Sequence, residues 1–162
     1  MRCHLALAEE DGQQYGYYCA DVTRTKSLSD AWRPAQQQIY DIVHSVQQQC
    51  IQAVQTKRNM TLMQLHQLSV RLFRDILHQQ KIVSNEHHLS TIYPHCIGHY
   101  LGLDLHDTPS ISLNKPLAPG TVFTIEPGLR FSVDLCQRAK SVTSCVVITF
   151  LTILAHRGLR HG

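Results

Sequence analysis

Residues 93–109, YPHCIGHYLGLDLHDTP, concentrate groups that can bind metals or transfer protons. The stretch holds His95, His99 and His106, with Asp104 and Asp107 among them. Imidazole and carboxylate groups are common ligands of divalent cations, and imidazole exchanges protons near neutral pH. From these residues alone, a metal site and a histidine-rich loop with a satisfied core histidine fit about equally well.

Composition excludes several classes of protein. The chain has 162 residues, enough for one domain with a core, and its 43% hydrophobic content is too high for a disordered chain. Its net charge of +3 is not gathered into a Lys/Arg cluster, so we predict no nucleic-acid partner. The longest apolar run, residues 145–155, is shorter than the ~20 residues of a membrane span. We therefore predict no membrane partner, and a buried strand at this run.

The six cysteines are predicted to be reduced thiols. They occur without a CxxC pair, and the start of the sequence turns acidic too early for a secretory leader. These features predict an intracellular protein and leave a mitochondrial and a cytoplasmic location open.

Two amphipathic helices are predicted in the first half of the chain. The first, within residues 34–54, begins at Pro34, a favourable first-turn residue. The second, residues 62–81, is capped by Thr61. Their predicted buried faces follow helical spacing and comprise Ile39, Ile42, Val43, Val46, Cys50 and Val54 in the first, and Leu62, Leu65, Leu72, Phe73 and Ile76 in the second.

Strands are predicted on both sides of these helices. Residues 12–22 are aromatic and β-branched, and Asp21 lies at the end of this predicted strand. Residues 110–120 are predicted to form a loop. Residues 121–126 then predict a strand in which Thr124 and Glu126 share a face, followed by a sharp turn at residues 127–128.

Three motifs together resemble those of the pita-bread metallopeptidases. They are GYYCADVTRT at residues 16–25, PHCIGHYLGLDLHDTP at residues 94–109, and LAPGTVFTIEPGL at residues 117–129. Within that family they are most similar to Xaa-Pro aminopeptidases of the mitochondrial and bacterial aminopeptidase P branch. The resemblance implies an α+β pita-bread fold, incomplete at both ends. We expect a partial metallopeptidase domain over residues 1–130 and a divergent tail over residues 131–162.

The resemblance also implies a chemistry for individual residues. It implies a centre of two divalent metals, most often Mn²⁺, that removes the N-terminal residue of peptides with proline at the second position. Asp21 would be a bridging ligand, His99 a ligand of one metal, and Glu126 a ligand and candidate proton acceptor. His95 and His106 match the histidines that contact the substrate and stabilise the intermediate.

Two departures from the family pattern concern metal ligands. The family's first Asp lies where a gapless match puts Glu10, and Asp11 fits if one residue is deleted. We favour Asp11, although a slip of one residue reverses the face of a strand. The family's last metal-binding Glu has no counterpart, because residues 131–162 contain no glutamate. We therefore expect a truncated chain with weak binding of the second metal and little or no turnover.

Two other functions remain open for this sequence. One is an inactive pita-bread module that binds peptides or proteins without metal. The other is a dipeptidase of the prolidase type, which resembles the LGLDLHDTP motif nearly as well; a methionine aminopeptidase fits that motif less well.

Overall fold

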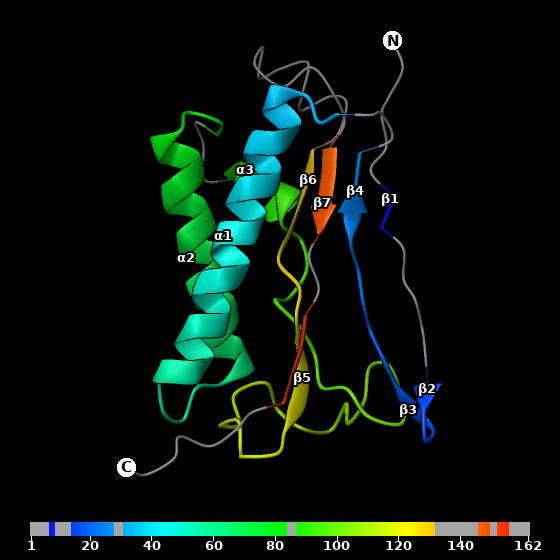
Figure 1. The fold of residues 1–162 in the computed structure, drawn as a ribbon. Helices are drawn as coiled ribbons and strands as arrows, with labels where there is room; N and C mark the ends of the chain where they lie inside the picture. The colour runs from blue at the N-terminus through cyan, green and yellow to red at the C-terminus, as the bar shows by residue number, and fades with distance from the viewer. Residues whose placement is uncertain are drawn as a thin grey trace.

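The computed structural model describes residues 7–8, 14–27, 31–83, 87–131, 146–149 and 152–155. Two long helices, α1 (Pro34–Thr56) and α2 (Leu62–Gln79), lie side by side, and the strands lie to one side of them (Figure 1). A short helix, α3 (His87–Ile92), lies near them. The strands are β1 (Leu7–Ala8), β2 (Gln14–Tyr15), β3 (Tyr18–Cys19), β4 (Thr25–Lys26), β5 (Val122–Ile125), β6 (Gly128–Phe131), β7 (Val146–Thr149) and β8 (Thr152–Ala155).

Both long helices were correctly predicted from hydrophobic periodicity. All six apolar residues predicted on the inner face of α1 are buried. In α2, Leu72 and Ile76 are partly buried against the core, and the other three predicted residues are fully buried. Thr61 caps α2, because its side-chain oxygen accepts a hydrogen bond from the Gln64 amide at 3.0 Å. None of the helices that the structure describes is long and apolar enough to cross a bilayer.

The predicted strand over residues 12–22 is instead a tight hairpin. β2 pairs with β3, and the turn between them places Gly16 and Tyr17 at φ values of 58° and 69°. Two consecutive positive φ values are the requirement of a type I′ hairpin turn, which matches the twist of the flanking strands. The prediction of strand structure is confirmed in β2 and β3, but it missed the turn between them because Tyr17 gives no signal of a left-handed conformation.

The strands in the second half of the chain form a long antiparallel ladder. β5 pairs with β8 and β6 pairs with β7 in one continuous register. The predicted strand at residues 145–155 is confirmed in β7 and β8, whose side chains lie outside the described residues. The predicted sharp turn at Pro127 was wrong. Because proline has no N–H, it interrupts the ladder between β5 and β6 without reversing the chain.

The segment at residues 97–101 pairs with the other edge of β5. The Glu126 amide donates to the Ile97 carbonyl at 2.7 Å, and the Thr124 amide donates to the His99 carbonyl at 2.9 Å. On the opposite face of β5, Phe123 is buried in the core. This pairing places His99 beside Thr124 and Glu126. The division predicted at residue 130 stays a prediction, although β7 and β8 beyond it pair with β6 and β5.

Candidate metal centre

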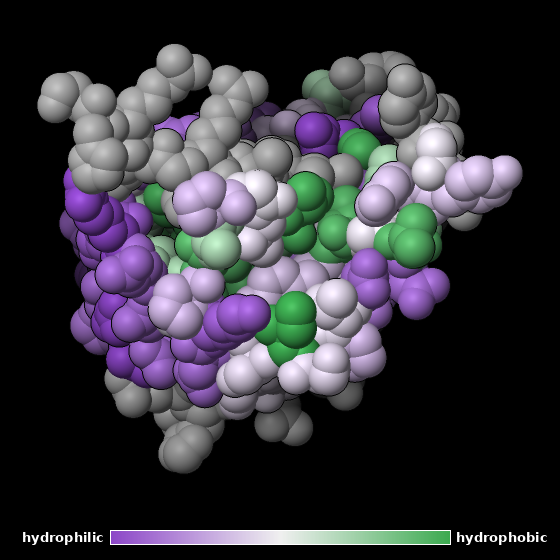
Figure 2. Space-filling view, turned by 90° about the horizontal axis from the view of Figure 1, so that it is seen from below, coloured by the Kyte–Doolittle hydropathy of each residue, from purple (hydrophilic) through white to green (hydrophobic). Residues whose placement is uncertain are grey.

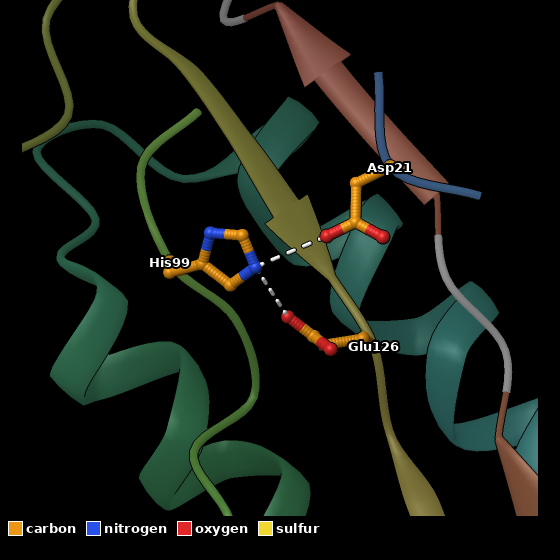
Figure 3. Close-up of side chains that lie close together, drawn as sticks. All are labelled: Asp21, His99 and Glu126. Carbon is orange, nitrogen blue, oxygen red and sulfur yellow. Dashed lines mark ion pairs between the residues drawn. The ribbon is translucent and has the colours of Figure 1, made fainter. Parts of the chain in front are cut away.

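Three side chains that are distant in the sequence converge at one point. Asp21 follows β3, His99 lies on the segment beside β5, and Glu126 directly follows β5. Figure 3 shows the three side chains pointing toward one another. The His99 Nε2 atom lies 3.2 Å from Asp21 Oδ2 and 3.1 Å from Glu126 Oε1. One ligand atom from each residue lies within 4.8 Å of the others, which is compact enough to surround a cation.

The cluster concentrates negative charge in a partly buried place. Asp21 is 5% exposed and Glu126 is 21% exposed. Two carboxylates held this close are unfavourable without a cation, since burial removes the water that would screen them. A protonated imidazole at His99 can supply that positive charge, and a divalent cation would supply more of it. The donor set of two carboxylates and one imidazole therefore fits a divalent metal.

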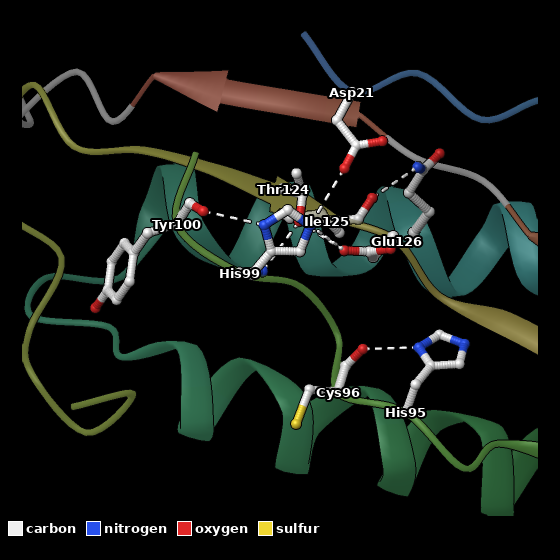
Figure 4. Close-up of polar contacts among 9 residues, drawn as sticks. Asp21, His95, Cys96, His99, Tyr100, Thr124, Ile125 and Glu126 are labelled. Atoms are coloured by element: carbon white, nitrogen blue, oxygen red, sulfur yellow. Dashed lines mark hydrogen bonds and ion pairs between the residues drawn. The ribbon is translucent and has the colours of Figure 1, made fainter. Parts of the chain in front are cut away.

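The orientation of the His99 ring is fixed from its other side. Its Nδ1 atom donates to the Tyr100 carbonyl at 3.0 Å, so Nε2 faces the two carboxylates (Figure 4). Metal-binding histidines are held in the same way, by a hydrogen bond from the second ring nitrogen. Burial lowers the pKa of His99, but hydrogen bonds to Glu126 and to the Tyr100 carbonyl and the charges of Glu126 and Asp21 together raise that pKa from 6.5 to about 9.

This raised pKa predicts how stability depends on pH in the presence of a chelator. The folded state holds the His99 proton more tightly than the unfolded state, so the stabilisation is complete below pH 6.5 and is lost as pH rises through 9. Between about pH 6 and about pH 10, the free energy of unfolding should fall by on the order of 1–3 kcal/mol from this group. Urea denaturation measures this change in the free energy of unfolding. The change should be much smaller in His99→Gln, and an equal change in both chains would contradict the assignment.

The predicted substrate-contacting histidine His106 lies directly beside the cluster. Its ring stacks on the His99 ring with centroids 4.1 Å apart and planes 10° apart. The loop that carries it is held by Asp107, whose amide donates to the Tyr100 carbonyl at 3.1 Å and whose Oδ2 accepts from the Leu103 amide at 3.0 Å. The Tyr100 carbonyl thus orients both the His99 ring and the loop of His106.

The other predicted residues are placed differently. His95 lies apart from the three clustered side chains (Figure 4). Its ring packs edge-on against Tyr93 at 5.1 Å, and its Nδ1 donates to the Cys96 carbonyl at 2.8 Å. Asp11, predicted as a further metal ligand, and its alternative Glu10 lie outside the described residues.

Sequence reasoning gave Thr124 no role, yet its side chain joins the cluster. Its hydroxyl contacts both the His99 amide and the Glu126 carboxylate. The signal that could have found it is the alternation of β5, which places residues 124 and 126 on one face.

An open cavity of about 210 Å³ lies farther along β5 and the segment at residues 97–101 that pairs with it. Its lining includes Leu101 and Val122, which lie two residues from His99 and Thr124 and so share their face of the strands. In Figure 2, hydrophobic residues gather towards the middle of the face seen from below, and hydrophilic residues cover one side of that face. Among the described residues, the exposed large hydrophobic side chains are Tyr17, Tyr18, Val22, Leu103 and Val122.

Comparison with known proteins identifies relatives of the chain. Intermediate cleaving peptidase 55, mitochondrial, from Arabidopsis thaliana is 36% identical over 140 residues, which cover 85% of this chain and 28% of that protein. The probable Xaa-Pro aminopeptidase PEPP of Paracoccidioides brasiliensis is 34% identical over 153 residues, covering 80% of this chain and 32% of that protein. The chain therefore spans about a third or less of the length of these relatives.

A solved structure confirms the predicted fold. The crystal structure of Icp55 from Saccharomyces cerevisiae matches with a TM-score of 0.79 and 36% identity, covering 86% of this chain and 35% of that one. The chain thus has part of the α+β pita-bread fold. A model of metallopeptidase family M24 matches residues 11–149. The chain belongs to metallopeptidase family M24, among relatives of the Icp55 and Xaa-Pro aminopeptidase type.

Proposed function

We propose that this chain carries the metal centre of an aminopeptidase that removes the N-terminal residue of peptides with proline at the second position. The observation that carries the proposal is the convergence of Asp21 and Glu126 on His99 Nε2, at 3.2 Å and 3.1 Å. Membership of the family and the Xaa-Pro aminopeptidases among its relatives support the choice of substrate.

Mn²⁺ is the metal that we propose for this centre. Carboxylates favour hard divalent ions, and a single imidazole is compatible with Mn²⁺. Asp21, His99 and Glu126 would hold the ion, and Asp11 would add a further carboxylate as the sequence predicts. A bound divalent metal acts as a Lewis acid and makes water nucleophilic near neutral pH.

The side chains of the chain would divide the remaining tasks. Glu126 is the candidate acceptor for the proton that water gives up. Its carboxylate is partly exposed and lies next to the other proposed ligands. His106, whose ring stacks on His99, would donate a hydrogen bond to a substrate oxygen as charge develops on that oxygen. His95 remains a proposed substrate contact. Its ring is anchored on Tyr93, so a substrate would have to approach it there.

The number of carboxylates limits what this chain does alone. No glutamate follows Glu126 in the sequence given, so nothing there matches the family's last metal-binding Glu. Two divalent ions need more negative charge than one, and we therefore propose that one Mn²⁺ binds firmly, that a second binds weakly and that turnover is slight. We propose an intracellular location, and the mitochondrial name of the Arabidopsis relative favours the mitochondrion over the cytoplasm.

The test is metal content and peptide recognition by the purified chain. We expect about one Mn²⁺ per chain by elemental analysis, removed by a chelator, as a carboxylate and imidazole site requires. The Mn²⁺-loaded chain should bind a tripeptide with proline at its second position more tightly than the same peptide with alanine there, by calorimetry. A dipeptide ending in proline serves as the comparison for the prolidase-type alternative.

Each outcome separates the candidate functions. Peptide binding without metal uptake would support the inactive binding module and contradict the metal centre. Preference for the dipeptide would support the prolidase type. Rapid manganese-dependent cleavage of the tripeptide would contradict our expectation that turnover is slight.

A further inference from the structure

Thr124 occupies the position between two of the proposed metal ligands. It lies on β5 and its side chain is fully buried. Its Oγ1 atom lies 3.0 Å from the His99 amide nitrogen and 2.8 Å from Glu126 Oε1 (Figure 4). A single hydroxyl therefore connects the backbone of one proposed ligand to the carboxylate of another.

The direction of these two hydrogen bonds is determined by the partners. An amide N–H can only donate, so Thr124 Oγ1 must accept from His99. A hydroxyl has one proton, and the ionised carboxylate of Glu126 can only accept it. The hydroxyl proton is thus directed at Oε1, the same oxygen that faces His99 Nε2 at 3.1 Å. The hydroxyl has no other arrangement that satisfies both neighbours.

We propose that Thr124 is a positioning residue for the metal centre, which sets the orientation of the Glu126 carboxylate relative to His99. This inference rests on the proposed metal-dependent function. Glu126 is 21% exposed, so without this hydrogen bond its carboxylate could rotate into solvent. Holding the carboxylate in place before the metal arrives lowers the entropy lost on binding, because fewer side-chain rotamers remain to be fixed.

The close packing of the neighbouring backbone supports this role. A Cβ atom at Gly98 would lie 2.8 Å from Thr124 Oγ1 and 2.7 Å from the Thr124 carbonyl carbon. The absence of a side chain at Gly98 therefore lets the segment at residues 97–101 approach closely enough for the hydroxyl to reach the His99 amide.

The experiment compares Thr124→Val with Thr124→Ser. Valine keeps the shape and removes the hydroxyl, while serine keeps the hydroxyl. Partners of metal ligands typically contribute about 10–100-fold to metal affinity, so we expect Thr124→Val to weaken Mn²⁺ binding by that factor in calorimetry. Thr124→Ser should bind within a few-fold of wild type. The absorption spectrum of the Co²⁺-loaded chain should shift in Thr124→Val and not in Thr124→Ser, because it reports the ligand geometry.

Ser69→Ala is the matched control for loss of a buried hydroxyl. Ser69 is also fully buried, and its hydroxyl lies 2.8 Å from the His66 carbonyl and 3.0 Å from the Tyr93 hydroxyl. Its loss should lower thermal stability without changing Mn²⁺ affinity. If Thr124→Val does not fold, Thr124→Cys takes its place, because a thiol is a weak hydrogen-bond donor. The same loss of Mn²⁺ affinity, about 10–100-fold, is then expected.

The outcomes distinguish this inference from the function on which it rests. Wild-type Mn²⁺ affinity in folded Thr124→Val, or equal loss in Thr124→Val and Thr124→Ser, would overturn the role of Thr124 alone. Absence of Mn²⁺ uptake by the wild-type chain would overturn the metal centre and this role with it.

Discussion

His99→Ala is expected to reduce manganese uptake to background. His99 supplies the nitrogen among the three proposed ligand atoms, and its ring is already oriented by the Tyr100 carbonyl. Without it, Asp21 and Glu126 have lost the group that lies between them. The site in His99→Ala keeps two carboxylates, but it lacks the third proposed ligand and the ring that lies between the carboxylates. Elemental analysis after dialysis against Mn²⁺ measures the loss.

Two other histidines serve as controls for this result. His78 is exposed near the end of α2, and His78→Ala should take up as much Mn²⁺ as the wild type. His106→Ala is the sharper comparison, because its ring stacks on His99 without belonging to the ligand cluster. It should keep the metal and weaken peptide binding. Metal retained in His99→Ala, or lost equally in His106→Ala, would contradict the proposed ligand set.

The parts of the fold that the sequence predicted well are those that local pattern determines. α1 and α2 have apolar residues at helical spacing, and that spacing alone identifies their buried faces. The conformation of the hairpin at Gly16 and Tyr17 was not predictable in this way, because a positive φ at tyrosine is imposed by the pairing of β2 with β3. The continuous register from β5 to β6 likewise depends on β7 and β8, which follow much later in the sequence.

The candidate site was likewise predictable only in part from the sequence. The motifs indicated Asp21, His99 and Glu126 as individual residues, but no local pattern states that they meet. Their meeting depends on the antiparallel pairing of residues 97–101 with β5, a contact between distant segments. The role that we propose for Thr124 depends on the same pairing. Alternation along β5 indicates that Thr124 and Glu126 share a face, but only the register of the pairing places Thr124 opposite His99.

Gly98→Ala tests that pairing directly and should have the largest effect on stability. A Cβ atom at this position would overlap the carbonyl oxygen of Thr124 and lie 2.7 Å from its carbonyl carbon. These are backbone atoms of β5, so they can give way only if the segment at residues 97–101 moves off the strand. That movement would lengthen the hydrogen bonds from Thr124 to His99 and from Glu126 to Ile97. We expect a loss of at least the ~1–3 kcal/mol typical of overpacking, together with the loss of Mn²⁺ uptake.

Gly102→Ala provides the matched control, because its clash is of a different kind. A Cβ atom there would overlap the carboxylate of Asp107, which is a side chain that can rotate away. Urea denaturation should therefore show a smaller loss of stability than in Gly98→Ala, and Mn²⁺ uptake should persist, since Asp107 holds the loop of His106 and not the ligand cluster. Wild-type stability in Gly98→Ala would mean that residues 97–101 do not pack on β5 as the structure places them. In that case His99 and Glu126 would have no common framework, and the proposed metal centre would lose its structural basis.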